Sequence, residues 1–260
     1  MSLPLIIVGG KAGVGKDTAA GIIGRKYGAV LIAQADPLKR LALWAMHFSQ
    51  EQLWGPSEMR NAPDNDKERI LDSWQNSKES KEAWLDDIGM YHPRFADKLQ
   101  DWFNQYVATP LLKQGCITPR HVLQTLGTEF GRANRPDVWV SYAQDRAIYA
   151  LANNQKYDRE AGLSPKAVNE PVTGMAVITD GRFPNEIIAT KRNGGFAFKI
   201  TGPGETSLGG VAAQHASETE MDKIPGYWYD EIIYNAKDGI ANLEGKVDAA
   251  LYNQKILRDR

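Results

Sequence analysis

The sequence predicts an α/β fold in which helices cover both faces of a parallel β-sheet. Short apolar segments rich in β-branched residues alternate with amphipathic segments along most of the chain, and this alternation is typical of a parallel sheet. A glycine-rich turn joins the first apolar segment to the first amphipathic one. Residues 49–118 interrupt the alternation and show no strand pattern. We therefore expect a sheet-based core formed by residues 1–48 and 119–260, with a mostly helical insertion at 49–118.

The first strand and the first helix flank a candidate phosphate-binding loop. The strand is expected at 5–8 and the helix at 18–27, and Gly10, Gly15 and Lys16 between them match the spacing G-x-x-x-x-G-K. Such glycines turn backbone N–H groups onto phosphate oxygens, while the lysine reaches the β- and γ-phosphates. We expect an ATP site made of Lys11, Gly13, Val14, Gly15, Lys16, Asp17 and Thr18.

One position of this loop departs from the motif. Asp17 stands where the motif has the Ser or Thr that binds Mg²⁺, and Thr18 follows it. Asp17 could lie near the metal while Thr18 contacts a phosphate, or the match could be an accidental glycine turn. The required order of strand, glycines, lysine and helix favours the first interpretation.

The next segments predict a second strand and a second helix. The strand is expected at 29–33, and apolar residues at helical spacing indicate a helix at 38–48. Between them, Asp36 and Pro37 are typical of a helix start, with the aspartate as N-cap. The tryptophans of the insertion favour anchors of a small core over a platform for stacking.

The middle of the chain predicts two helices and a loop. A proline at the start and apolar residues at helical spacing indicate a helix over 119–132, which Gly131 is expected to end. A second helix is expected over 137–151. Residues 153–173 are polar and have no apolar period, so they predict a surface loop.

The C-terminal part continues the alternation of strands and helices. One glycine-rich, polar stretch within it is typical of a loop or lid. In chain order, we expect a strand at 175–180, a helix from 184, a strand at 196–200, the loop or lid at 201–225, a strand at 231–234 and a helix at 239–256.

The first three predicted strands deliver candidate functional groups to one edge of the sheet. Ligands of parallel sheets bind beyond the carboxyl ends of the strands, where the phosphate-binding loop, Asp36 and Asp180 follow. Asp180 suits a carboxylate that holds Mg²⁺ through water, or a helix N-cap. Asp36 suits a second metal-side group, a group that orients a substrate hydroxyl, or an N-cap. Candidate metal ligands are Asp17, Thr18 and Asp180, and candidate catalytic residues are Lys16, Arg182 and Asp36.

Several arginines suit a phosphorylated acceptor. Phosphoryl transfer needs positioning and positive charge around the moving phosphate, and the planar fork of arginine suits bidentate phosphate binding. Gln124 and Thr128 are four residues apart on one predicted helix face and could read the edge of a base. The candidate arginines are Arg120, Arg132, Arg135 and Arg182.

Composition narrows the class of protein. The 260 residues include 42% hydrophobic and 24% charged residues, as in ordinary soluble globular proteins. The formal net charge of −1 argues against stable nucleic-acid binding. Cys116 is the single cysteine, which excludes an internal disulfide and suits a reducing cytoplasm. No apolar run approaches the length of a membrane span, so we expect no membrane association.

Five short motifs occur in order along the chain. They are Gly-Gly-Lys-Ala-Gly-Val-Gly-Lys-Asp-Thr (9–18), Ala-Asp-Pro-Leu-Lys (35–39), Leu-Gln-Thr-Leu-Gly-Thr-Glu-Phe-Gly-Arg (123–132) with Trp139, Thr-Asp-Gly-Arg-Phe-Pro-Asn-Glu (179–186) and His-Ala-Ser-Glu (215–218). Together they resemble the deoxynucleoside monophosphate kinases of tailed bacteriophages. The resemblance covers nearly the whole chain except the insertion.

This resemblance implies a three-layer P-loop kinase fold with a five-stranded parallel sheet in the order 2-3-1-4-5. It implies ATP- and Mg²⁺-dependent phosphorylation of deoxynucleoside monophosphates (dNMPs) to diphosphates for phage DNA synthesis, by a homodimer in the host cytoplasm. Asp180 and Arg182 would lie next to the phosphates, and the insertion on the monophosphate side. His215 would be a lid contact or an ordinary loop histidine. The expected acceptor site comprises Asp36, Lys39, Arg120, Gln124, Thr128, Arg132 and Trp139.

Two other functions fit part of the pattern. A P-loop kinase for another small phosphorylated acceptor, such as dephospho-coenzyme A or phosphomevalonate, would also use a Gly-Lys-Asp loop and arginines. A nucleotide-binding module that hydrolyses ATP slowly would need the loop alone. A panel of acceptors separates these functions from a dNMP kinase.

Overall fold

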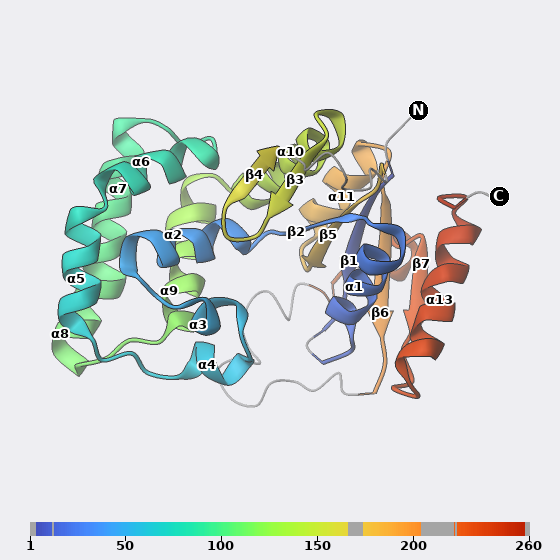
Figure 1. Ribbon diagram of the computed structural model, residues 1–260, viewed down its shortest axis with the longest axis horizontal. Coiled ribbons are helices and arrows are strands. Elements are labelled where there is room, and N and C mark those ends of the chain that lie inside the picture. The colour runs from blue at the N-terminus through green and yellow to red at the C-terminus, as the bar shows by residue number, and fades with distance from the viewer. Residues whose placement is uncertain (1–3, 12, 166–173, 204–220, 222, 258–260) are drawn as a thin grey trace. The chain divides into compact units, whose positions relative to one another are not determined.

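A computed structural model describes residues 4–11, 13–165, 174–203, 221 and 223–257 (Figure 1). The chain divides into two compact units. One, which we call the sheet unit, comprises Met1–Gln34, Ala143–Asp158 and Leu163–Arg260. The other, the helical unit, comprises Ala35–Tyr142 and Arg159–Gly162. Most of the predicted lid, with His215, lies outside the described residues.

The sheet unit contains the predicted five-stranded sheet. All neighbouring strands are parallel, and their order is β2-β5-β1-β6-β7. Numbered within the sheet alone, this order is 2-3-1-4-5, so the predicted α/β fold of P-loop kinases is confirmed. The strands are β1 (Leu5–Gly9), β2 (Val30–Ala33), β5 (Ala176–Gly181), β6 (Phe196–Thr201) and β7 (Glu231–Tyr234).

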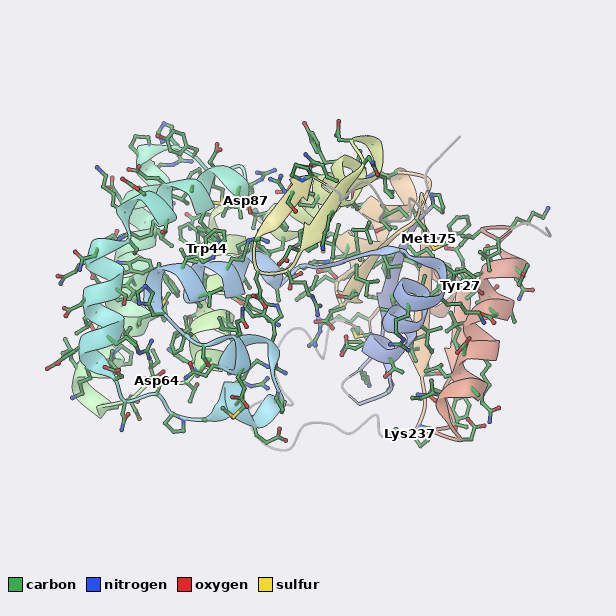
Figure 2. The ribbon with its side chains drawn as sticks, in the orientation of Figure 1. Tyr27, Trp44, Asp64, Asp87, Met175 and Lys237 are labelled. Carbon is green, nitrogen blue, oxygen red and sulfur yellow. The ribbon has the colours of Figure 1, made fainter. Side chains whose placement is uncertain are left out.

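Helices cover both faces of this sheet, as Figure 1 shows. On one face, α1 (Lys16–Tyr27) and α13 (Ile240–Asn253) pack on apolar side chains of the strands, and together they form one buried core. The phenol of Tyr27 joins the two helices by donating to Asp248 Oδ1 at 2.6 Å (Figure 2). On the other face, α11 (Pro184–Arg192) lies against β1 and β6. Because helices bury both faces of the sheet, a central strand such as β1 is a continuous apolar run without polar alternation.

The helical unit contains the predicted insertion. Its tryptophans Trp74, Trp84 and Trp102 are at most 3% exposed, and Trp74 stacks on Phe103 with ring centroids 4.1 Å apart. These three are therefore core anchors, as expected. The elements are α2 (Asp36–Met46), α3 (Gln50–Trp54), α4 (Ser57–Asn61), α5 (Lys67–Asn76), α6 (Lys78–Asp87), α7 (Pro93–Phe103), a π-helical segment (Asn104–Ala108), α8 (Thr109–Gln114), α9 (Pro119–Thr125) and a second π-helical segment (Leu126–Arg132).

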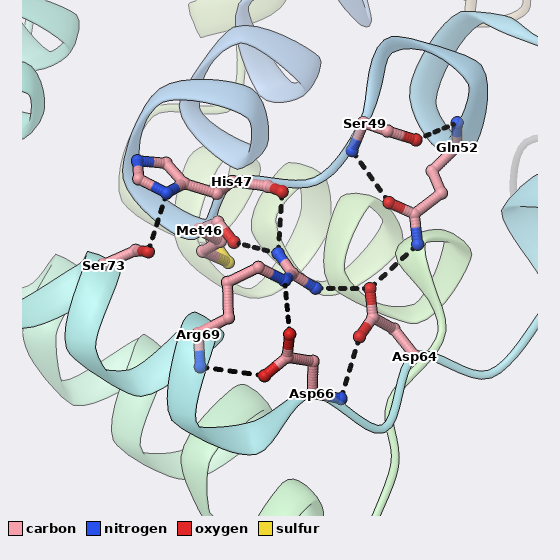
Figure 3. Close-up of polar contacts among 8 residues, drawn as sticks. All are labelled: Met46, His47, Ser49, Gln52, Asp64, Asp66, Arg69 and Ser73. Carbon is pink, nitrogen blue, oxygen red and sulfur yellow. Dashed lines mark hydrogen bonds and ion pairs between the residues drawn. The ribbon is translucent and has the colours of Figure 1, made fainter.

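A polar network joins the short helices of this unit (Figure 3). Arg69 on α5 donates to the backbone oxygens of Met46 and His47, both at 2.7 Å, where α2 ends. Its guanidinium also pairs with Asp64 Oδ2 at 2.5 Å, and Gln52 on α3 donates to the same oxygen at 2.8 Å. Arg69 thus satisfies carbonyl groups at the C-terminal end of α2 and, through the shared Asp64 carboxylate, links α5 to α3.

Two sequence predictions were wrong. Residues 153–173 are not simply a loop, because they include the hairpin of β3 (Gln155–Asp158) and β4 (Gly162–Pro165). Tyr157 is the one apolar side chain that the hairpin buries, so the hairpin has almost no apolar pattern. Gly131 does not end a helix, because α9 continues into the second π-helical segment.

No helix within the described part of the chain is long and apolar enough to cross a membrane.

α10 (Val138–Ala152) begins in the helical unit and ends in the sheet unit.

Candidate functional site

The loop after β1 has the backbone geometry of a phosphate-binding loop. β1 ends at Gly9 and α1 begins at Lys16. Gly13 and Gly15 lie in the left-handed region, with φ of 80° and 93°, where an L side chain is strained. Gly15 is also the N-cap of α1 and has no side chain to satisfy the helix N–H groups. The positive end of α1 is therefore open to an anion.

Lys16 lies between two carboxylates of this loop region. Its side chain is only 9% exposed, and Nζ lies 3.4 Å from both Asp17 Oδ2 and Asp180 Oδ1. A buried ammonium held by ion pairs at the start of a helix is ready to exchange a carboxylate for phosphate oxygens. Lys11, just after β1, is half-buried.

Asp180 reaches this position through a bulge in β5. Val8 of β1 pairs with Thr179, but the next residue, Gly9, pairs with Gly181. Asp180 is therefore the extra residue, and its φ of 68° shows the distortion. Asp180 is not the N-cap of α11, because that cap is Phe183. The alternative that Asp180 only caps a helix is thus wrong.

Two cations hold Asp180 in its ionised form. Burial alone would raise the pKa of this carboxyl group. The positive charges and hydrogen bonds of Arg182 and Lys16 outweigh burial and lower the pKa to about 2. Arg182 Nε lies 2.8 Å from Asp180 Oδ1. Asp180 therefore carries a negative charge throughout the physiological pH range.

Glu186, which the sequence reading did not single out, fixes the turn that follows Asp180. Its carboxylate is 2% exposed. Glu186 Oε2 accepts hydrogen bonds from the backbone N–H groups of Arg182 at 2.6 Å and Phe183 at 3.0 Å. The sequence carries only half of the capping-box signature, a Glu three residues past the N-cap, because phenylalanine at 183 has no side-chain acceptor.

The candidate metal ligands fit Mg²⁺ bound together with a nucleotide. Asp17 is 78% exposed on the first turn of α1, Thr18 is exposed beside it, and Asp180 is ionised. Among the described residues, no group of three or more His, Cys, Asp or Glu side chains could hold a metal ion. Mg²⁺ commonly needs only one or two protein carboxylates, with phosphates and water as its other ligands.

A second group of candidates surrounds Asp36 in the helical unit. Asp36 is fully buried, and its Oδ1 lies 3.3 Å from Trp54 Nε1 and 3.5 Å from Arg159 Nε. Lys39 lies over the Trp54 ring, with Nζ 5.4 Å from the centroid. Asp36 is not an N-cap, because the cap of α2 is Ala35 and no side chain bonds there. The N-cap interpretation of Asp36 is therefore wrong.

Trp54 and Arg159 are candidate site residues that sequence reasoning missed. Trp54 lies in the insertion, where the tryptophans were expected to anchor a core, but it is only partly buried. Arg159 lies between β3 and β4, in the segment that was expected to be a surface loop. No local pattern links Arg159 to Asp36, because the two residues are 123 positions apart in the sequence. Their contact depends on how the intervening chain folds.

The remaining acceptor candidates lie along α9 and the π-helical segment after it. Arg120 donates to Asn61 Oδ1 at 2.5 Å and Ser57 Oγ at 2.7 Å, so α4 orients its guanidinium. Gln124 is half-buried, Thr128 is exposed, and Arg132 is half-buried at the end of the π-helical segment.

Trp139 has a supporting place in the helical unit. Its side chain is 3% exposed, and its indole N–H donates to the Gly127 carbonyl at 2.9 Å. An added Cβ on Gly131 would lie 2.1 Å from the Trp139 ring. Trp139 thus fixes the backbone between Gly127 and Gly131, while its polar atom is already engaged.

Comparison with known proteins finds a distant relative in sequence. No protein-family model matches the chain. A protein of Acanthamoeba polyphaga mimivirus described as "Putative deoxynucleotide monophosphate kinase" is 27% identical over 231 residues, which cover 89% of this chain and 87% of that protein. The chain is thus a distant homologue of a protein named as a nucleotide kinase, and the predicted resemblance is confirmed at that level.

Proposed function

We propose that this protein is a kinase that uses ATP and Mg²⁺ to phosphorylate deoxynucleoside monophosphates to diphosphates. The observation that carries the proposal is the placement of Lys16 between Asp17 and Asp180 at the open N-terminus of α1. The distant viral homologue supports a nucleotide kinase. Such an activity supplies precursors for DNA synthesis, and a bacteriophage would use it in the cytoplasm of its host.

In the proposed reaction, the sheet unit binds ATP. Backbone N–H groups between Lys11 and Thr18 hold the phosphates, and Lys16 leaves Asp180 for the β- and γ-phosphate oxygens. Arg182, already aligned by Asp180, adds positive charge as the γ-phosphoryl group moves. Asp17, Thr18 and Asp180 would hold Mg²⁺, directly or through water. When bound, Mg²⁺ neutralises phosphate charge.

The helical unit, in the same proposal, binds the acceptor. The residues 49–118 then form the monophosphate side, and the cationic groups of Lys39, Arg120, Arg132 and Arg159 bind its phosphate. Gln124 and Thr128 contact the base, and the carboxylate of buried Asp36 orients a substrate hydroxyl. Trp139 acts by supporting the backbone of this region. We also propose a homodimer, which should sediment at twice the 28.9 kDa of one chain.

A coupled measurement of ADP tests this function. The protein is given ATP and Mg²⁺ with dAMP, dGMP, dCMP, dTMP or modified dNMPs, each alone, beside a blank without acceptor. We expect ADP formation well above the blank with one or more dNMPs. A high blank with no effect of acceptor would identify an ATPase module. Dephospho-coenzyme A and phosphomevalonate are tested in the same way, and turnover with one of them but with no dNMP would identify a different small-molecule kinase.

The variant Lys16→Ala shows whether the observed activity belongs to this site. Deleting a preorganised donor to the moving phosphoryl group should lower kcat by about 100-fold or more. The matched control is Lys246→Ala on α13, whose Nζ donates to the Tyr234 carbonyl at 2.9 Å and lies over the Tyr234 ring. The control should keep wild-type kcat. Equal kcat in Lys16→Ala and in the control would place catalysis elsewhere.

A further inference from the structure

Asn235, the first residue after β7, has no part in the function proposed so far. Its side chain is buried, with 8% exposed, and Nδ2 donates a buried hydrogen bond of 2.9 Å to the Val14 carbonyl oxygen. Val14 belongs to the candidate phosphate-binding loop, 221 residues away in sequence. A buried side-chain amide thus ties the far end of the chain to that loop.

The amide also lies directly against Gly15. An ideal Cβ built on Gly15 would lie 2.5 Å from Asn235 Nδ2. Gly15 is therefore required for two reasons, its φ of 93° and the space that the amide occupies. An ideal Cβ on Gly10 would lie 2.8 Å from Val14 Cγ2. Val14 is thus contacted at its side chain by Gly10 and at its carbonyl oxygen by Asn235.

Three further contacts fix Asn235 itself. Its backbone N–H donates to the Thr201 carbonyl at 2.7 Å. Its Oδ1 accepts a hydrogen bond of 3.1 Å from the backbone N–H of Lys237, which is labelled in Figure 2. Because a backbone N–H can only donate and a carbonyl can only accept, these partners also settle which way the amide faces. Its backbone oxygen lies against Gly202, where an added Cβ would be only 2.2 Å away.

This arrangement sets the direction of a phosphate-facing donor. A trans peptide is planar, and its C=O and N–H point in opposite directions. By holding the Val14 carbonyl on one side, Asn235 fixes the Gly15 N–H on the other side. Backbone N–H groups in this loop are the donors that an anion would meet. Preorganised donors bind an anion without first having to be ordered.

We propose that Asn235 is a positioning residue that holds the Val14–Gly15 peptide in the conformation that binds the ATP phosphates. This role rests on the proposed ATP site, and it needs no particular acceptor. Asn235 acts through the loop and not by touching the reacting atoms. Its loss should therefore change the affinity for ATP and leave the affinity for the acceptor unchanged.

Two variants test this role by equilibrium binding of MgATP to the whole protein, measured by calorimetry. Asn235→Ala removes the hydrogen bond, and we expect the Kd for ATP to rise about tenfold. Asn235→Asp keeps the shape but turns a carboxylate oxygen toward the Val14 carbonyl, so its Kd should rise further. The matched control is Asn242→Ala, because Asn242 is exposed on α13 and donates to the Asp238 carbonyl of the adjoining loop.

A second measurement separates positioning from general stability. The KM for the best dNMP should stay within twofold of wild type in both Asn235 variants, and both should unfold cooperatively on heating. An unchanged Kd for ATP in Asn235→Asp would overturn the proposal. Failure of both variants to fold would also overturn it, by assigning Asn235 to the core of the sheet unit. Wild-type protein that binds ATP but phosphorylates no dNMP would refute only the proposed acceptor.

Discussion

At the scale of single residues, the candidate site depends on groups held in unusual states. Asp180 has a strained backbone conformation at a bulge in β5. The positive charges of Arg182 and Lys16 offset the desolvation of its carboxylate. Lys16 is itself nearly buried. Removing one member of such a cluster weakens the charge compensation of the others. Strain and buried charge of this kind are typical of functional sites.

The charge of Asp180 should be visible in the pH dependence of stability. Its pKa falls from 3.8 to about 2 on folding. A carboxyl group whose pKa is lowered on folding stabilises the protein at pH values above the pKa of the unfolded state. This contribution disappears as the pH falls through the pKa of the folded state. The Tm of wild type should therefore exceed that of Asp180→Asn at pH 7, and the difference should narrow between about pH 4 and pH 2.

The control for this titration is Asp238→Asn, at an exposed aspartate of the same unit. Its Tm should follow that of wild type at every pH. A difference between wild type and Asp180→Asn that stays constant from pH 7 to pH 2 would contradict the ion pairs described for Asp180.

Arg159 gives a second test at this scale. Its side chain is 49% exposed and its Nε faces the buried Asp36, so the rest of the guanidinium can meet an acceptor phosphate. Arg159→Ala should raise the KM for the dNMP several-fold and leave the KM for ATP unchanged. Arg94→Ala, at an exposed arginine of the same unit, should change neither. If Arg159→Ala changed the KM for ATP but not the KM for the dNMP, Arg159 would not belong to the acceptor site.

At the scale of elements, the segment from α9 to Arg132 shows how packing overrides local propensity. Gly127 and Gly131 weaken a helix in isolation, yet the backbone continues through both as π-helical turns. The indole N–H of Trp139 bonds the Gly127 carbonyl, and its ring fills the space beside Gly131. Glycine is therefore required at 131 for close approach and does not act as a helix stop.

A pair of glycine substitutions measures this packing. Gly131→Ala would drive a methyl group into the Trp139 ring and should lower the free energy of unfolding by about 1–3 kcal/mol. Gly245→Ala, on α13, meets nothing within 4 Å and should raise the free energy by about 0.5–1 kcal/mol through better helix propensity. Urea unfolding of both variants checks these signs. Stabilisation by Gly131→Ala would show that the ring does not occupy that space.

At the scale of the whole molecule, the parts predicted best from sequence are those with a strong repeating pattern. The five strands of the sheet are short apolar runs, so their places could be predicted, whereas their order was implied by the family resemblance. The β3–β4 hairpin was missed because Tyr157 is its one buried apolar side chain. A short hairpin with a single buried apolar side chain leaves almost no hydrophobic period to detect.

The candidate site divides in the same way. Lys16 and the loop glycines could be predicted because their chemistry is local in sequence. The bulge at Asp180 could not be predicted, since it depends on how β5 registers against β1. The contacts of Arg159 with Asp36 and of Asn235 with Val14 join distant parts of the chain. Only the folded structure places such pairs together.

The most direct test of the account is ADP production from ATP and Mg²⁺ with each dNMP alone, compared with a blank without acceptor. We expect turnover above the blank with at least one dNMP, and loss of that turnover in Lys16→Ala. Turnover equal to the blank with every dNMP, from protein that is folded and binds ATP, would contradict the proposed kinase.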